Sequence, residues 1–196
     1  MSSLLNENVY LVKQHIGMFK AENSFDVYNP ETSKIILFCR EENLSGLTKF
    51  FRFTKYKQYT PFNSVIRTEN QTPIIYLNRK ASLGFSPVIV HDSTNKPIGK
   101  LQPKFRLGGA KLEITDMAGK VLAVLTGSFI GWDFKIRQND EEIAIITKKW
   151  AGIGKELFSQ ADNYVLQIND KVPADSPVRP ILLSAVLCID FLLKND

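Results

Sequence analysis

The residues of this chain that could do chemistry are basic and aromatic, and most of them gather in one stretch. Between residues 49 and 59, cations alternate with rings: Lys49, Arg52, Lys55 and Lys57 lie among Phe50, Phe51, Phe53, Tyr56 and Tyr59. Ammonium and guanidinium groups attract anionic phospholipid headgroups, and aromatic side chains favour the boundary below them. The stretch therefore predicts contact with a membrane surface.

Two other interpretations of this stretch stay open. It could be a short helix that covers a core and turns a solvated basic side outward. Basic and aromatic residues also stack on RNA or single-stranded DNA, but one cluster is a weak signal for nucleic acid. A second basic pair, Lys135 and Arg137, falls on one face of a predicted strand and could hold a phosphate, although ordinary exposed charges would look the same.

The sequence shows few patterns that are typical of enzyme active sites. There is no Gly-x-Ser-x-Gly motif, and the glycines at 152–154 form too short a run for a dinucleotide-binding loop. His15, His91 and Cys39 lie in strand-like runs, and Cys188 lies in an apolar run where a thiol should be buried and inert. We expect a protein that is not an enzyme and has no cofactor.

Composition places the chain in a broad class. It has 196 residues, 44% of them hydrophobic, which suits one domain over residues 1–196. The net charge of +5 is modest, and it suits anionic lipid as well as any other anionic partner. The two cysteines show no metal or disulfide spacing, and the first residues show no signal-peptide pattern. We expect a cytoplasmic location, with peripheral attachment to the inner membrane surface as an option.

The C-terminal run RPILLSAVLCIDFLLKND predicts a helix over about 179–193. Its apolar part, 181–193, would span about 20 Å as a helix, whereas the hydrocarbon layer of a bilayer is about 30 Å thick. Asp190 further disfavours insertion. Apolar residues nevertheless cover every face, which is typical of a helix surrounded by protein. We therefore expect no transmembrane span and a helix buried in the core.

The remaining chain breaks into short β-like runs separated by turn residues. The clearest alternation is in WDFKIRQ, where Trp132, Phe134 and Ile136 share a face. A helix is predicted after a Ser45 cap, with Leu47, Phe50, Phe51 and Thr54 on one side. The predicted strands are residues 9–16, 24–28, 34–40, 64–68, 74–78, 88–91, 98–105, 111–115, 121–126, 132–138, 143–147 and 164–169.

These elements predict an all-β fold with a central helix. About twelve antiparallel strands would close into a β-barrel, which removes exposed edges, and a barrel of that width needs a filler. The hydrophobic C-terminal α-helix is the candidate that we expect the barrel to enclose. The predicted core includes Trp132, Phe134, Leu187, Asp190 and Phe191, with Asp190 as a hydrogen-bonded anchor.

The second half of the chain, about residues 98–196, resembles the phospholipid scramblase family and its relatives in the tubby-like and LURP-one-related superfamily, and the first half does so more weakly. That resemblance implies a twelve-stranded barrel around a central C-terminal helix. This sequence shows neither a proline-rich stretch nor a cysteine cluster like those of animal scramblases. The resembling residues are Lys149, Trp150, Gly152, Glu156, Leu157, Phe158, Ala161, Asp162, Asn163, Tyr164, Ile189, Asp190 and Phe191.

The resemblance also raises a calcium site, because the scramblase loop that corresponds to residues 161–177 has been linked to calcium. Asp162 and Asp170 offer suitable hard oxygen ligands. The spacing is not that of an EF-hand, and a strand over 164–168 would hold the two carboxylates apart. We favour turns and helix caps over calcium binding here.

The leading functional prediction is a non-enzymatic module that binds phospholipid headgroups or membrane surfaces. A regulatory or protein-interaction domain without a lipid role is the alternative, and a lipid scramblase is the third. If the basic residues of 49–57 form an exposed surface, charge reversal at Lys49, Arg52, Lys55 and Lys57 should abolish binding to anionic liposomes and leave the melting temperature nearly unchanged.

Overall fold

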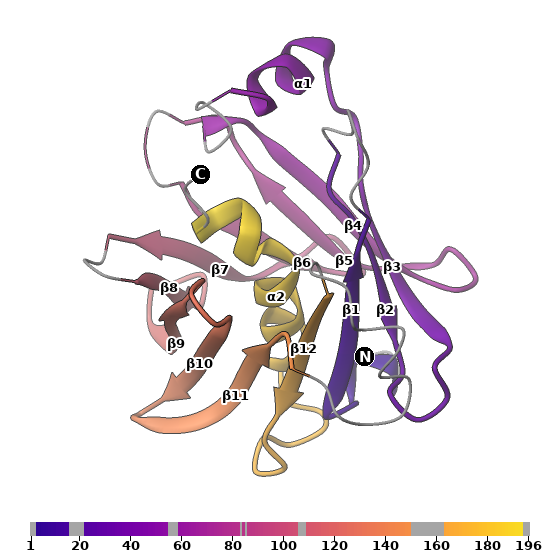
Figure 1. The fold of residues 1–196 in the computed structure, drawn as a ribbon, viewed down its shortest axis with the longest axis vertical. Coiled ribbons are helices and arrows are strands. Elements are labelled where there is room, and N and C mark those ends of the chain that lie inside the picture. The colour runs from indigo at the N-terminus through magenta and orange to yellow at the C-terminus, as the bar shows by residue number, and fades with distance from the viewer. Residues whose placement is uncertain are drawn as a thin grey trace.

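The computed structural model describes residues 3–15, 22–54, 59–82, 84, 86–105, 109–149 and 163–193. In this part of the chain, twelve antiparallel strands follow one another around a barrel, which closes where β1 pairs with β12 (Figure 1). The strands are β1 Val9–Gln14, β2 Ser24–Tyr28, β3 Ile35–Glu41, β4 Phe62–Thr68, β5 Pro73–Arg79, β6 Val88–Asp92, β7 Pro97–Lys104, β8 Ala110–Thr115, β9 Val121–Ser128, β10 Asp133–Gln138, β11 Glu141–Thr147 and β12 Asn163–Ile168. The helices are η1 Ser3–Leu5, α1 Gly46–Arg52 and α2 Arg179–Leu193.

Alternation along the strands builds the barrel wall. Leu101 in β7, Leu112 in β8 and Phe134 in β10 are fully buried, while their neighbours in sequence are more exposed. Each of the twelve predicted strands overlaps one observed strand, and the prediction of a closed barrel with a central helix is confirmed. Inward-facing side chains are therefore set by the two-residue period of a strand.

Trp132 departs from the prediction. It does not lie in the strand with Phe134, because β10 begins at Asp133 and Trp132 adopts a left-handed backbone conformation with φ of 52°. The connection from β9 to β10 spans only residues 129–132, and such a tight turn needs positive φ values. Trp132 is half-buried and packs against the edge of the core.

Helix α2 fills the barrel (Figure 1). The described side chains from Arg179 to Leu192 are all buried, including Leu187 and Phe191; the side chain of Asp190 lies outside the described residues. Gly99 in β7 faces the helix, and a Cβ there would lie 2.6 Å from Ile181 Cδ1. Within the described residues, we find no helix with the length and hydrophobicity that a membrane crossing requires.

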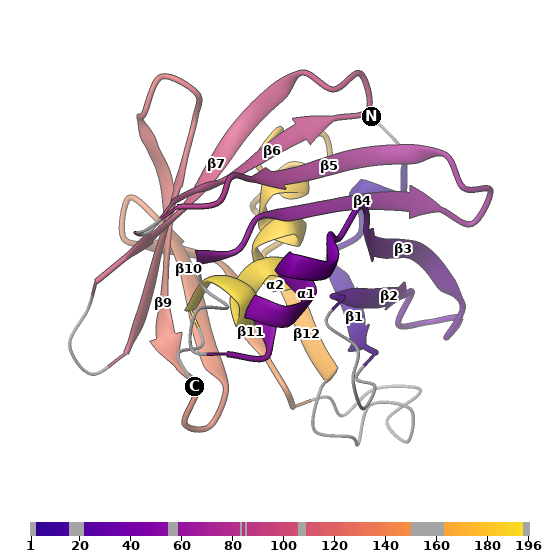
Figure 2. The ribbon, with the colours of Figure 1, turned by 90° about the horizontal axis from the view of Figure 1, so that it is seen from above.

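The up-and-down topology gives the barrel two different ends. The connections that follow odd-numbered strands, including the segment with α1, lie at one end, which we call the α1 end. The connections that follow even-numbered strands lie at the other, which we call the far end. Helix α2 begins at the far end and finishes at the α1 end, where Phe191 stacks on Phe62 at a centroid distance of 4.7 Å. Viewed from above, α1 lies across this end of the barrel (Figure 2).

Candidate functional site

Helix α1 begins at the predicted cap. The Ser45 side chain accepts a hydrogen bond from the Thr48 backbone N–H at 3.2 Å, which satisfies one of the unpaired donors of the first turn. The helix ends at Arg52, and the Phe53 N–H bonds to the Phe50 carbonyl at 3.2 Å. The result is a helix of seven residues that connects β3 to β4.

The apolar side of α1 points away from the barrel. Leu47 is 68% exposed, Phe50 66% and Phe53 61%. Apolar periodicity in a surface helix normally marks the face that packs on the core, so α1 is inverted relative to that rule. An exposed apolar patch of this kind is typical of a surface that meets a membrane or another molecule. We call Leu47, Phe50 and Phe53 the α1 apolar face.

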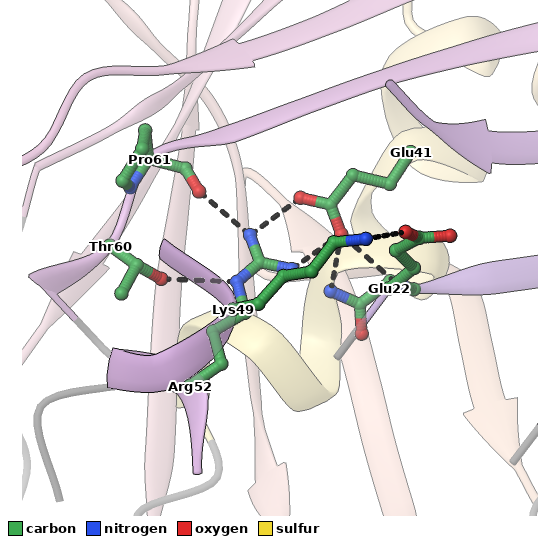
Figure 3. A network of polar contacts seen from close by, with 7 residues as sticks. Glu22, Glu41, Lys49, Arg52, Thr60 and Pro61 are labelled. Carbon is green, nitrogen blue, oxygen red and sulfur yellow. Dashed lines mark hydrogen bonds and ion pairs between the residues drawn. The ribbon is translucent and has the colours of Figure 1, made fainter. Parts of the chain in front are cut away.

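Arg52 explains the inversion, because its guanidinium group points inward (Figure 3). Nη1 and Nη2 each lie 2.5 Å from one carboxylate oxygen of Glu41, and Nη2 also donates to the Pro61 carbonyl at 2.7 Å. Nε donates to Thr60 Oγ1 at 3.3 Å. The bidentate pair is buried on both sides, and it fixes α1 to β3 and to the start of β4.

This geometry corrects the prediction that Arg52 belongs to an exposed basic surface that contacts a membrane. Arg52 is 7% exposed, and its guanidinium carbon lies 5.2 Å from the centroid of Phe191 on α2. A guanidinium group enclosed in this way cannot reach a lipid headgroup. Its role is to hold α1 on the end of the barrel, so we remove Arg52 from the predicted lipid-binding residues.

Lys49 keeps an exposed position beside the α1 apolar face. Its Nζ lies 2.8 Å from Glu22 Oε1, and both side chains are about half exposed (Figure 3). The segment that carries Glu22 is itself tied to the network, because the Asn23 N–H donates to Glu41 Oε2 at 3.0 Å. Exposed ion pairs are weak, so this pair contributes little to holding Lys49 in place. Lys55 and Lys57 lie outside the described residues.

The other predicted basic pair is not part of this surface. Lys135 Nζ lies 3.3 Å from Glu142 Oε2 on the neighbouring strand, and Arg137 is exposed nearer the far end. The pairing between β10 and β11 also shifts register between Ile136 and Arg137. The structure therefore does not bring Lys135 and Arg137 together with α1.

The predicted calcium ligands are only partly described. Asp162 lies outside the described residues, and Asp170 Oδ1 accepts a hydrogen bond from Asn8 Nδ2 at 2.7 Å. In the described part of the chain, no group of three or more His, Cys, Asp or Glu residues could hold a metal ion. The observed partner of Asp170 fits a turn between β12 and α2.

Both thiols are buried. Burial raises the pKa of Cys39 to about 12 and raises the pKa of Cys188 well above its ordinary value. Because the thiolate is the reactive form, both cysteines are poor nucleophiles.

Sequence reasoning missed two features of this surface. It did not place Leu47 outward, because apolar periodicity alone does not tell which side of a short helix packs on a core. It also did not pair Lys49 with Glu22, since the two residues are distant in sequence and come together only through the barrel. A usable signal was Arg52 itself: a cation on the side of α1 opposite the apolar residues could have been read as an inward anchor.

Comparisons with known proteins agree on a family. A family model described as Scramblase matches residues 1–194. Phospholipid scramblase 1 of Mus musculus is 31% identical over 93 residues, which cover 46% of this chain and 27% of that protein. Phospholipid scramblase 1 of Homo sapiens is 34% identical over 62 residues, which cover 31% of this chain and 19% of that protein. The matches therefore span less than a third of each scramblase.

The fold has a counterpart among solved structures. An X-ray structure of a protein from Arabidopsis thaliana superposes with a TM-score of 0.54 and covers 93% of this chain and 90% of its own. The two sequences are 12% identical, so this likeness concerns the fold alone.

Proposed function

Because the chain belongs to the Scramblase family, we propose that it is a non-enzymatic module that binds phospholipid membranes peripherally through the α1 end of its barrel. Anionic headgroups are the ligand, and the α1 apolar face enters the boundary between headgroups and acyl chains. Lys49 contributes the electrostatic attraction. Movement of lipid between leaflets is not part of this proposal.

The observation that carries the proposal is the outward display of the α1 apolar face by a buried ion pair. Leu47, Phe50 and Phe53 are each more than 60% exposed, although the Arg52–Glu41 pair fixes the helix they belong to. Moving an exposed side chain of this size out of water is worth about 1.5–3 kcal/mol. A basic residue near an anionic surface adds about 1 kcal/mol. These magnitudes fit reversible membrane binding that needs both contributions.

Flotation with liposomes tests the proposal. Vesicles of phosphatidylcholine, with and without phosphatidylserine or a phosphoinositide, are mixed with the protein at low and at high salt. We expect flotation with the anionic vesicles at low salt and weaker flotation at high salt, because salt screens exposed charges.

Matched variants locate the contact. Combined Leu47→Ser, Phe50→Ser and Phe53→Ser should abolish flotation and leave the melting temperature unchanged, because all three side chains are exposed. Combined Met117→Ser and Val121→Ser, which remove exposed apolar side chains at the far end, should float like the unchanged protein. The proposal fails if none of the vesicles carries the unchanged protein upward. It also fails if the triple variant floats as well as the unchanged protein. If the unchanged protein binds no vesicle but binds another protein, and the triple variant loses that binding, the protein-interaction alternative is favoured.

A further inference from the structure

A second group of exposed apolar side chains lies at the α1 end, outside α1 itself. Ile130 is 92% exposed in the connection between β9 and β10, and Phe105 is 75% exposed directly after β7. Among the described residues, eight large hydrophobic side chains are exposed. Two of them, Met117 and Val121, belong to the far end. The other six belong to the α1 end and are Leu47, Phe50, Phe51, Phe53, Phe105 and Ile130.

The connection that carries Ile130 is a defined turn, which we call the finger (residues 129–132). The Ile130 N–H donates to Ser128 Oγ at 3.0 Å. Gly131 and Trp132 follow with φ values of 85° and 52°. A positive φ is uncommon for a residue other than glycine and needs support from its surroundings. The finger is thus a turn with an internal hydrogen bond and two left-handed residues, and it exposes Ile130.

Aromatic packing supplies that support. The Trp132 ring meets Phe129 edge-on at a centroid distance of 5.0 Å and lies 5.1 Å from the ring of Tyr164. Lys148 Nζ lies 3.7 Å from the centroid of Trp132, within the range of a cation–π contact. The base of the finger is thus held by β12 and by the end of β11. Ile130 remains 92% exposed although its neighbours Phe129 and Trp132 pack against the core.

Close strand contact also fixes the finger. Gly127 in β9 lies opposite Phe134 in β10, and a Cβ at Gly127 would lie 2.3 Å from the Asp133 carbonyl oxygen. Only glycine fits this approach, so Gly127 permits the close contact of the two strands that carry the finger.

The charges at this end favour an anionic occupant. In the described connections of the α1 end, the acidic residues are Glu22 and Glu42, and each is ion-paired, with Lys49 and Arg67 respectively. Lys80 and Lys149 are exposed there. Asp133 is also exposed, at the first position of β10, so the preference for an anion belongs to this end as a whole. Apolar tips among cations match the layered chemistry of an anionic bilayer.

We propose that the finger and Phe105 are further membrane-insertion points, so that the barrel stands on an anionic bilayer with its α1 end and Ile130 enters the acyl region. This rests on the proposed function and deepens it, because it fixes the orientation of the molecule. Contacts at α1, Phe105 and Ile130 come from three different connections, so together they prevent the barrel from tilting freely. The C-terminal end of α2 then faces the bilayer.

A fluorescent label at one position tests the orientation. The variant Ile130→Cys is coupled to the environment-sensitive dye NBD, and Met117→Cys at the far end is the matched control. Cys39 and Cys188 are buried, so the introduced thiol reacts selectively. The labelled proteins are mixed with vesicles of phosphatidylcholine and phosphatidylserine, with and without a spin-labelled lipid that quenches the dye in the acyl region.

We expect the label at 130 to shift to shorter wavelength and to be quenched, and the label at 117 to remain in water. Ile130→Asp, without a label, should weaken vesicle binding by roughly ten-fold or more and keep the melting temperature of the unchanged protein.

Three results would overturn the orientation. If the label at 130 stays in water while the protein floats with the vesicles, the finger does not insert, and the proposed function is still supported. Absence of flotation in every protein removes the proposed function and the orientation together. A label at 130 that becomes shielded without vesicles, as protein concentration rises, would mean that a second copy of the chain covers this end.

Discussion

The connections between strands differ in kind at the two ends of the barrel. At the far end, short turns satisfy their own backbone donors with acidic or amide side chains. Asp116 Oδ1 accepts from the Lys120 N–H at 2.9 Å, and Asn29 Oδ1 accepts from the Glu31 N–H at 2.9 Å. At the α1 end, the connections are longer or carry apolar residues, and they leave Leu47, Phe50 and Ile130 in water.

The two ends also differ in how their carboxylates are stabilised, and Asp92 is an example from the far end. Hydrogen bonds from the Thr94 hydroxyl and from the Lys96 and Thr94 N–H groups lower the pKa of this far-end carboxyl, so it stays ionised and would repel an anionic surface. Two carboxylates of the α1 end are instead paired with cations, because Glu41 is buried against Arg52 and Glu22 faces Lys49. The two ends thus differ in how their carboxylates are paired and in how many large apolar side chains they expose.

Removal of α2 should break both ends together, and it is the largest effect that we predict. A chain that ends after Val178 loses a helix whose described side chains are almost all buried. Truncation of one large core side chain costs about 2–5 kcal/mol, and a domain has about 5–15 kcal/mol in total. The shortened chain should lack a cooperative thermal melt by circular dichroism. A chain that ends after Leu193 is the control and should melt like the full chain; a native melt after removal of α2 would place the helix outside the core.

Arg52→Met should destabilise the protein through the α1 end. The change leaves the buried carboxylate of Glu41 without its bidentate partner, which typically costs about 3–5 kcal/mol in the free energy of unfolding. Urea unfolding measures the loss. A variant that also carries Glu41→Leu should regain much of it, because an apolar pair replaces an ionic one. Because Arg52 is buried in an ion pair, charge reversal at all four basic residues of 49–57 should lower the melting temperature, which corrects the expectation that it stays nearly unchanged. Equal stability of Arg52→Met and the unchanged protein would mean that α1 is not anchored by this pair.

Gly127→Ala should have a smaller effect, confined to the strands below the finger. The added methyl group would meet the Asp133 carbonyl oxygen at 2.3 Å, and overpacking of this kind costs about 1–3 kcal/mol. A change of that size lowers the melting temperature by roughly 2–12 °C in a chain of this length. Gly46→Ala in α1 is the control, since a Cβ there has no heavy atom within 4 Å. If the two variants melt together, the close approach of β9 and β10 is not required.

Lys49→Glu should have the smallest effect, and on binding rather than stability. Removal of one cation from an anionic surface costs about 1 kcal/mol, or roughly five-fold in affinity, and the reversed charge adds to this. Glu22→Gln should act in the opposite direction, because it releases Lys49 from its ion pair. Lys120→Glu at the far end is the control and should leave affinity for phosphatidylserine vesicles unchanged. Equal losses for Lys49→Glu and Lys120→Glu would mean that net charge, and not the α1 end, controls binding.

The sequence predicted the barrel well, because inside–outside alternation is a local property of each strand. Phe134, Leu187 and Phe191 are buried as expected. It predicted the candidate surface less well, because that surface depends on which residues become neighbours across the barrel. The direction of α1 follows from Arg52 reaching Glu41, and the place of Trp132 follows from a four-residue turn packed on Tyr164 and Lys148. Neither contact leaves a periodic pattern in the sequence.

Hydrogen–deuterium exchange of the unchanged protein, with and without vesicles of phosphatidylcholine and phosphatidylserine, tests most directly whether the two ends differ in function. We predict slower exchange on vesicle binding in residues 42–54 and in the finger, and no change in the far-end turns 93–96 and 116–120. Slower exchange at the far-end turns alone, or no change anywhere while the protein floats with the vesicles, would contradict the assignment of the α1 end as the membrane-binding surface.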